Sequence, residues 1–155
     1  MLKNIHPALN GTLLDALSEL ESGSWLAITN DAPAAAQASA TVLGLDTDFE
    51  GATEAILSVL PVHAEDDAPL HFWVQEPEND ENWDIVFAVT GLVRDGERRA
   101  VTSQHISSAT ARAAIATAAL VVHLPDARPD ATFLIRVGGQ AAAGVRPTGL
   151  TCAQA

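Results

Sequence analysis

Apolar residues recur at helical spacing in the segment between residues 10 and 23. One face of this expected helix carries Leu13, Leu14, Leu17 and Leu20. Asn10 or Thr12 can cap its first turn, and Gly23 stands just past its end, where glycine commonly follows a helix. The run SWLAIT over 24–29 is almost continuously apolar, which predicts a strand covered on both faces.

This alternation of helix and strand continues to Pro61. Pro33 opens the alanine-rich segment 33–40, and proline is well tolerated in the first turn of a helix. The run TVLGL at 41–45 predicts a second buried strand, and 46–61 predicts a helix with acidic residues in its first turn. Helix, strand, helix, strand, helix is the order typical of an α/β domain with parallel strands.

The middle of the chain has a different pattern. Two β-rich runs, 68–76 and 83–93, surround the polar stretch PENDEN. An Asp-Gly turn signal at 95–96 precedes a third such run at 100–106. We expect these runs to form an extra β hairpin or meander beside the parallel sheet.

The last third returns to the first pattern. Residues 107–119 predict an alanine-rich helix capped by Ser107 or Ser108, and 120–124 and 131–137 predict two strands. The expected fold is therefore α/β, with three α/β/α layers around a mainly parallel sheet. We expect a single domain over residues 1–139 and an irregular C-terminal tail over 140–155.

Composition narrows the classes of partner. The formal net charge of −12 disfavours binding to nucleic acid or to an anionic membrane, because like charges repel. The longest apolar run, 113–124, is too short to span a bilayer, and the first residues lack a secretory apolar stretch. We therefore expect a cytoplasmic protein with no membrane partner.

The sequence offers no strong metal or cofactor motif. Cys152 is the single cysteine, so no disulfide can form within the chain. The stretch DTDFEG imitates the start of a calcium loop, but Leu57 stands where that loop needs a glutamate. No two histidines stand four residues apart on a helix. We expect no metal and no cofactor.

Polar residues do follow two of the expected strands directly. Asn30 and Asp31 come after 25–29, and Asp126 and Asp130 come after 120–124. In open α/β sheets, ligands bind beyond the carboxyl ends of the strands, so these side chains could share one crevice. Ordinary turn chemistry explains the same residue types, and the pattern alone does not decide between the two readings.

His123 interrupts the apolar run of 120–124. A histidine in such a place is either a hydrogen-bonded core or interface residue or an acid/base group in a pocket. The sequence leaves both readings open.

Several segments together resemble the ribose/fucose mutarotase family (RbsD/FucU). The opening MLKNIHPAL, the leucine helix ending at Gly23, and EAILSVLPV at 54–62 are similar to family segments in the same order. The segment 119–139, ALVVHLPDARPDATFLIRVGG, resembles the family's last strands. The similarity covers residues 1–62 well and 107–139 loosely, and 63–106 do not align.

This resemblance implies an RbsD-like fold and a place in carbohydrate metabolism. Family members interconvert the anomers or ring forms of monosaccharides by acid/base ring opening, without metal or cofactor. They assemble as ring-shaped homo-oligomers, decamers, with pockets near the subunit contacts. A monosaccharide ligand and a homo-oligomer are thus the implied partners.

The chain departs from the family at its functional positions. The family's histidine falls on Ser22, and its strand-end aspartate falls on Asn30, or on Asp31 with a slip of one residue. A late-helix tyrosine falls near Arg112, and a Tyr-x-Asn motif falls on Asp130 and Thr132. The chain contains no tyrosine, and hydroxyls of serine and threonine do not titrate near neutral pH.

Two hypotheses follow. In the first, the protein is a diverged mutarotase, a cofactor-free isomerase in which Asp31, with Asp130 or His123, transfers the protons. The residues expected to bind the sugar are then Ser22, Asn30, Arg112, Asp126 and Thr132. In the second, the protein is a pseudoenzyme of this family that binds a sugar or serves in assembly.

Overall fold

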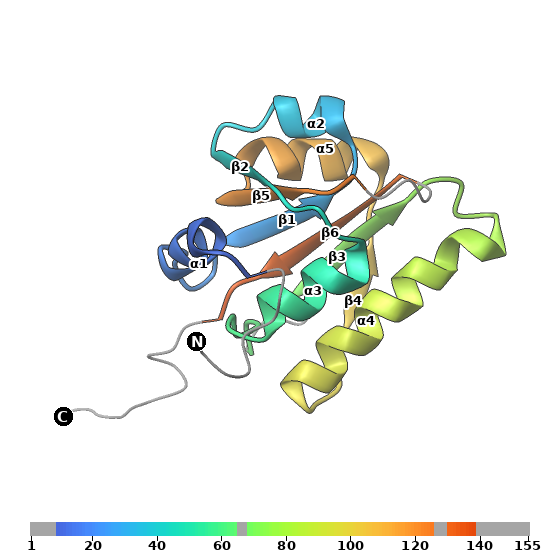
Figure 1. Ribbon diagram of the computed structural model, residues 1–155. Coiled ribbons are helices and arrows are strands. Elements are labelled where there is room, and N and C mark those ends of the chain that lie inside the picture. The colour runs from blue at the N-terminus through green and yellow to red at the C-terminus, as the bar shows by residue number, and fades with distance from the viewer. Residues whose placement is uncertain (1–8, 65–67, 126–129, 139–155) are drawn as a thin grey trace.

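The computed structural model describes residues 9–64, 68–125 and 130–138 (Figure 1). Its helices are α1 (Gly11–Ser18), α2 (Ala32–Ala36), α3 (Phe49–Leu57), the 3-10 helix η1 (Asp80–Trp83), α4 (Asp84–Glu97) and α5 (Ser108–Thr117). Its strands are β1 (Trp25–Thr29), β2 (Thr41–Gly44), β3 (Leu70–Val74), β4 (Ser103–His105), β5 (Leu120–His123) and β6 (Ala131–Arg136).

The six strands form one mixed sheet in the order β2-β5-β1-β6-β3-β4. The pairs β1/β5, β2/β5 and β3/β4 are parallel, whereas β6 runs antiparallel to both of its neighbours, β1 and β3. Helices α2 and α5 cover one face, and α3 and α4 cover the other (Figure 1). The expected three-layer α/β/α architecture with a mainly parallel sheet is confirmed.

Side chains of successive strand residues enter two separate cores. Leu26 and Ile28 of β1 pack toward α3 and α4, while Ala27 between them packs toward α2 and α5. The same division holds on β6, where Phe133 and Leu134 enter opposite cores. This period of two places the odd-numbered residues of β1 on the α2/α5 face.

Local signals in the sequence explain most of the helix starts. The side chain of Asn10 accepts a hydrogen bond from the Leu13 N–H at 2.8 Å and so caps α1. Ser107 caps α5 in the same way, through the Thr110 N–H at 3.1 Å. Gly23 has φ +90°, a left-handed conformation that suits glycine in the turn between α1 and β1.

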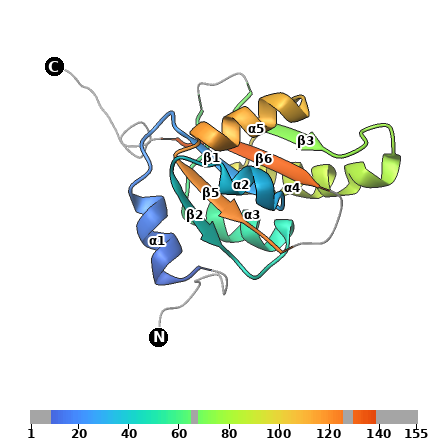
Figure 2. The same ribbon diagram turned by 90° about the horizontal axis from the view of Figure 1, so that it is seen from above.

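The expected hairpin or meander in the middle is wrong. Strand β3 forms as expected, but residues 84–93 of the β-rich run 83–93 lie in the long helix α4 (Figure 2). Its buried residues are Ile85, Val86, Val89 and Val93, which recur at helical spacing and pack on the core under the sheet. Burial of this helical face overrides the strand preference of β-branched residues.

Two smaller expectations also need correction. Strand β2 forms, but it is an edge strand rather than a buried one, and Val42 is 41% exposed. Strand β4 forms within the expected run 100–106, and it pairs in parallel with β3 rather than through a hairpin. The expected tail over 140–155 lies outside the described residues.

Among the described residues, no helix is both long enough and apolar enough to cross a membrane.

Candidate functional site

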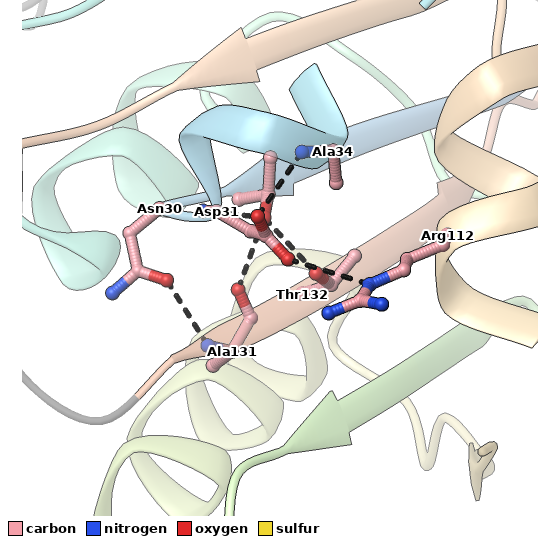
Figure 3. Close-up of polar contacts among 7 residues, drawn as sticks. Asn30, Asp31, Ala34, Arg112, Ala131 and Thr132 are labelled. Carbon is pink, nitrogen blue, oxygen red and sulfur yellow. Dashed lines mark hydrogen bonds and ion pairs between the residues drawn. The ribbon is translucent and has the colours of Figure 1, made fainter. Parts of the chain in front are cut away.

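The candidate site begins where β1 ends. Thr29 is fully buried as the last residue of the strand, and its hydroxyl accepts a hydrogen bond from the Asp31 N–H at 3.0 Å. Asp31 is the N-cap of α2, and its Oδ1 accepts from the Ala34 N–H at 3.1 Å (Figure 3). The turn from β1 into α2 therefore holds the Asp31 carboxylate in one orientation.

The start of β6 closes the same end of the sheet. Asn30 Oδ1 accepts a hydrogen bond from the Ala131 N–H at 3.1 Å (Figure 3). The hydroxyls of Thr29 and Thr132 lie 3.0 Å apart, and both side chains are buried. These bonds join residues about a hundred positions apart in the chain, so they fix the end of β1 relative to the start of β6.

Arg112 reaches this cluster from α5. Its Nε lies 3.9 Å from Asp31 Oδ2, the carboxylate oxygen that does not cap α2 (Figure 3). The Asp31 side chain is only 11% exposed, whereas that of Arg112 is 69% exposed. A mostly buried carboxylate thus lies beside a guanidinium that solvent or a ligand can reach.

Asp130 lies at the same end of the sheet, but hydrogen bonds of its backbone rather than of its side chain hold it there. Its backbone pairs with Gln75, donating to Gln75 Oε1 at 3.2 Å and accepting from the Gln75 N–H at 2.8 Å. Asp130 itself is exposed. Asp31 and Asp130 therefore lie at one end of the sheet, as the shared-crevice reading requires. Asp126, expected in the same crevice, lies outside the described residues.

His123 is in register with Thr29 across the β1/β5 pair, on the side of Thr29 away from Thr132. Its Nε2 is buried and has no hydrogen-bond partner among the described residues. The ring borders a hollow of about 370 Å³ between α2 and β2. In the sheet, Thr29 therefore lies between His123 on β5 and Thr132 on β6. Ala32, next to Asp31 in the chain, borders the same hollow as His123.

Ser22 is not part of this cluster. It precedes β1, whereas Asn30 follows it, so the five residues of the strand separate them by roughly 17 Å at 3.3 Å per residue. Ser22 is exposed and borders a mainly apolar hollow of about 530 Å³ between α1 and the end of α3. Within one chain, the structure brings together Asn30, Asp31, Arg112 and Thr132, with Asp130 at the same edge.

Two residues of this region were missed by the sequence analysis. Thr29 closes an apolar run, and this single polar position at a strand end was the available signal. Trp73 is in register with Thr132 across the β3/β6 pair and is partly buried. It lies in the segment 63–106, which did not align with the family, so nothing in the sequence pointed to it.

The cluster combines a hydrogen-bond acceptor with a hydrogen-bond donor. The carboxylate of Asp31 can accept hydrogen bonds, and the guanidinium of Arg112 can donate them. Among the described residues, no group of three or more His, Cys, Asp or Glu side chains lies close enough to hold a metal ion. Fold and site together define a mixed α/β protein with a polar cluster at the carboxyl end of a central strand.

Solved structures of sugar-related proteins share this fold. Atu2016, described as a candidate sugar-binding protein, has a TM-score of 0.79 and 27% identity, over 90% of this chain and 96% of its own. The fucose mutarotase of Streptococcus pneumoniae, solved with L-fucose, has a TM-score of 0.76 and 16% identity, over 89% and 99%. FucU from Bifidobacterium longum has a TM-score of 0.71 and 23% identity, over 84% and 94%.

No protein-family model matches the chain, and no curated protein does. The structural matches confirm the resemblance found in the sequence, and the chain has an RbsD/FucU-like fold.

Proposed function

We propose that this protein binds a monosaccharide at the carboxyl end of β1. The observation that supports this most directly is the pairing of Asp31, 11% exposed, with Arg112, 69% exposed, at 3.9 Å. Neighbouring sugar hydroxyls each donate and accept a hydrogen bond. The Asp31 carboxylate can accept a hydrogen bond from one hydroxyl of the sugar, and the Arg112 guanidinium can donate one to its neighbour.

In a single chain, the Arg112 side chain is 69% exposed. We propose that a second copy of the chain closes the site, in keeping with the ring-shaped homo-oligomer that the family resemblance implies. The buried Thr29 and Thr132 would then form the support of the pocket, and Asn30 and Arg112 would contact the sugar.

Mutarotation is the second candidate function. Ring opening requires one group to remove the proton from the anomeric hydroxyl and another to protonate the ring oxygen. Asp31 is the described residue best placed for the first role, because one of its oxygens is turned toward Arg112 rather than into the helix cap. The exposed Asp130 at the same edge is the candidate for the second role.

The geometry supports binding better than catalysis. The family's histidine is replaced by Ser22, which lies at the other end of β1, and the buried His123 Nε2 has no hydrogen-bond partner among the described residues. Asp130 is exposed, and its hydrogen bonds to Gln75 run through its backbone rather than its carboxylate, so they do not orient the second acid/base group.

Thermal unfolding with a panel of monosaccharides tests binding. A sugar present at about 100 times its Kd adds about 2.7 kcal/mol of stability to the native state, which raises Tm measurably. The variants Asp31→Asn and Arg112→Gln should abolish the shift. Asp48→Asn, at the N-cap of α3, is the matched control and should retain it.

Exchange between anomers, followed by saturation-transfer NMR, tests catalysis on any sugar that binds. Acceleration that Asp31→Asn removes would establish a mutarotase. A sugar that stabilises the protein without faster exchange would establish a binding protein. If no sugar of the panel shifts Tm or exchanges faster with the folded protein, both functions are wrong.

A further inference from the structure

A third hollow lies at the end of β1 opposite Asp31, on the sheet face that α2 and α5 cover. It has a volume of about 400 Å³ and lies between α5 and the strands β1, β3 and β6. Residues around it include Ser24, Trp25, His71, Ala114, Thr117 and Leu134. It shares no residue with the cluster at Asp31, because Trp25 opens the strand that Thr29 ends.

Two aromatic rings form one wall of this hollow. The ring centroids of Trp25 and His71 lie 4.6 Å apart, with planes tilted by 36°. The guanidinium of Arg136 lies over the Trp25 ring at 5.7 Å, and its Nε donates to the Gly23 carbonyl at 3.1 Å. These contacts fix the orientation of the indole, and the partly buried Trp25 side chain borders the hollow.

The other residues that line the hollow are apolar or carry a hydroxyl. Leu134 is only 2% exposed, and Ala114 contributes no more than a methyl group from α5. Ser24 Oγ donates to the Glu21 carbonyl at 2.6 Å, and Thr117 Oγ1 donates to the Ala113 carbonyl at 3.2 Å. With their protons engaged, both hydroxyls present lone pairs that accept hydrogen bonds from a ligand.

We propose that this hollow is a second carbohydrate-binding site, which takes the apolar face of a pyranose ring against Trp25. A pyranose presents C–H groups on one face and hydroxyls around its edge. The fixed indole can pack against the C–H face, and the acceptor hydroxyls of Ser24 and Thr117 can bind the hydroxyls of the sugar. Its volume lies at the small end of the range of about 300–1,000 Å³ for ligand pockets, which fits a single ring.

The indole N–H signals of the three tryptophans in a ¹⁵N-correlated NMR spectrum test this site. Single Trp→Phe variants assign the signals of Trp25, Trp73 and Trp83. The probes are methyl α-D-glucopyranoside, methyl β-D-galactopyranoside and methyl α-L-fucopyranoside, whose blocked anomeric carbons prevent ring opening. At least one should shift the Trp25 signal saturably, and the shift should persist in Asp31→Asn.

Ala114→Leu places a larger side chain in the hollow that Trp25 and His71 also line. It should weaken this binding by about tenfold or more, which corresponds to about 1.4 kcal/mol. Ala113→Leu is the matched control, because Ala113 is the exposed neighbour outside the hollow and should leave binding unchanged.

Three results would overturn the proposal. The first is a folded protein whose Trp25 signal responds to none of the three glycosides. The second is a response that Ala114→Leu leaves unchanged. The third is a lower oligomer mass in Ala114→Leu, measured by light scattering, without any glycoside response. That result would show that a second copy of the chain covers the hollow. Loss of the thermal shift at Asp31 would not affect any of these readouts.

Discussion

The two faces of the sheet are packed by side chains of very different size. The core toward α3 and α4 holds Phe49 and Phe133, whose rings meet edge to face at 5.4 Å. The core toward α2 and α5 is formed largely by alanines, namely Ala27, Ala34, Ala35, Ala111 and Ala118. Alanine lets helices approach the sheet closely but fills little volume.

This difference explains where the candidate sites lie. Asp31, Arg112 and Thr132 are on the α2/α5 side, as are the hollows beside His123 and Trp25. The face with large side chains supplies the apolar burial, which is the main favourable term in folding. The alanine face contributes less burial, and two hollows lie at its margins, whereas the hollow of about 530 Å³ near Ser22 borders the large core. We infer that stability and ligand binding are divided between the two faces, and the predictions below test this division.

Truncation of neighbouring residues on β6 should give the largest difference. Phe133→Ala removes a fully buried ring from the large core and should cost about 3–5 kcal/mol. Leu134→Ala, on the alanine face, should cost about 2–3 kcal/mol, the low end for a buried leucine, because its side chain already borders an open hollow. Urea unfolding of both variants measures the two costs. A larger cost for Leu134→Ala would contradict the division.

Much of this architecture could be predicted from the sequence because its signals are local. The caps at Asn10 and Ser107 act through backbone groups three residues away, so the sequence contains the whole interaction. Helix α4 could not be predicted in this way. Its Val86, Val89 and Val93 favour a strand by residue type, and only burial against the sheet makes the helical face decisive.

The candidate site could be predicted only in part, for a similar reason. Asn30 and Asp31 follow a strand, and the rule for strand ends finds them. The contacts of Thr29 with Thr132 and of Asn30 with Ala131 depend on the register of β1 against β6, which no local signal encodes. Ser22 was included through the family resemblance, which assigns a position in the sequence but not an end of the strand.

Loss of the buried hydroxyl at the strand end should have the next largest effect. Thr29→Val keeps the shape of the side chain but leaves Thr132 Oγ1 and the Asp31 N–H without the Thr29 oxygen. The expected cost is about 1–3 kcal/mol, because buried polar groups then lack a partner. The double variant Thr29→Val with Thr132→Val should cost less than the sum of the single variants. Strict additivity in urea unfolding would show that the two hydroxyls do not interact.

Two substitutions of Asp31 separate its cap from its charge. Asp31→Ala removes the N-cap of α2 and should cost about 1 kcal/mol. Asp31→Asn retains a side-chain acceptor, so its cost should be only a few tenths of that, while sugar binding is lost in both variants. Asp48→Ala, the same change at the cap of α3, should lower stability similarly and leave binding intact. Retention of sugar binding in Asp31→Asn would remove the carboxylate from the site.

The smallest effect on stability is expected at Arg112. An ion pair at 3.9 Å whose arginine is 69% exposed contributes at most about 1 kcal/mol, and this contribution falls at high salt. Arg112→Gln should therefore leave urea unfolding almost unchanged but remove the thermal shift caused by sugar.

Arg94, paired with Asp95 at 3.7 Å and 64% exposed, is the matched control, and Arg94→Gln should change neither property. Both arginines are exposed, but Arg112 faces a carboxylate that is 11% exposed and Arg94 one that is 76% exposed, so a loss of binding at Arg112 alone would assign a binding role to the end of β1. Equal behaviour of the two variants would mean that Asn30 and Asp31 only form the turn into α2.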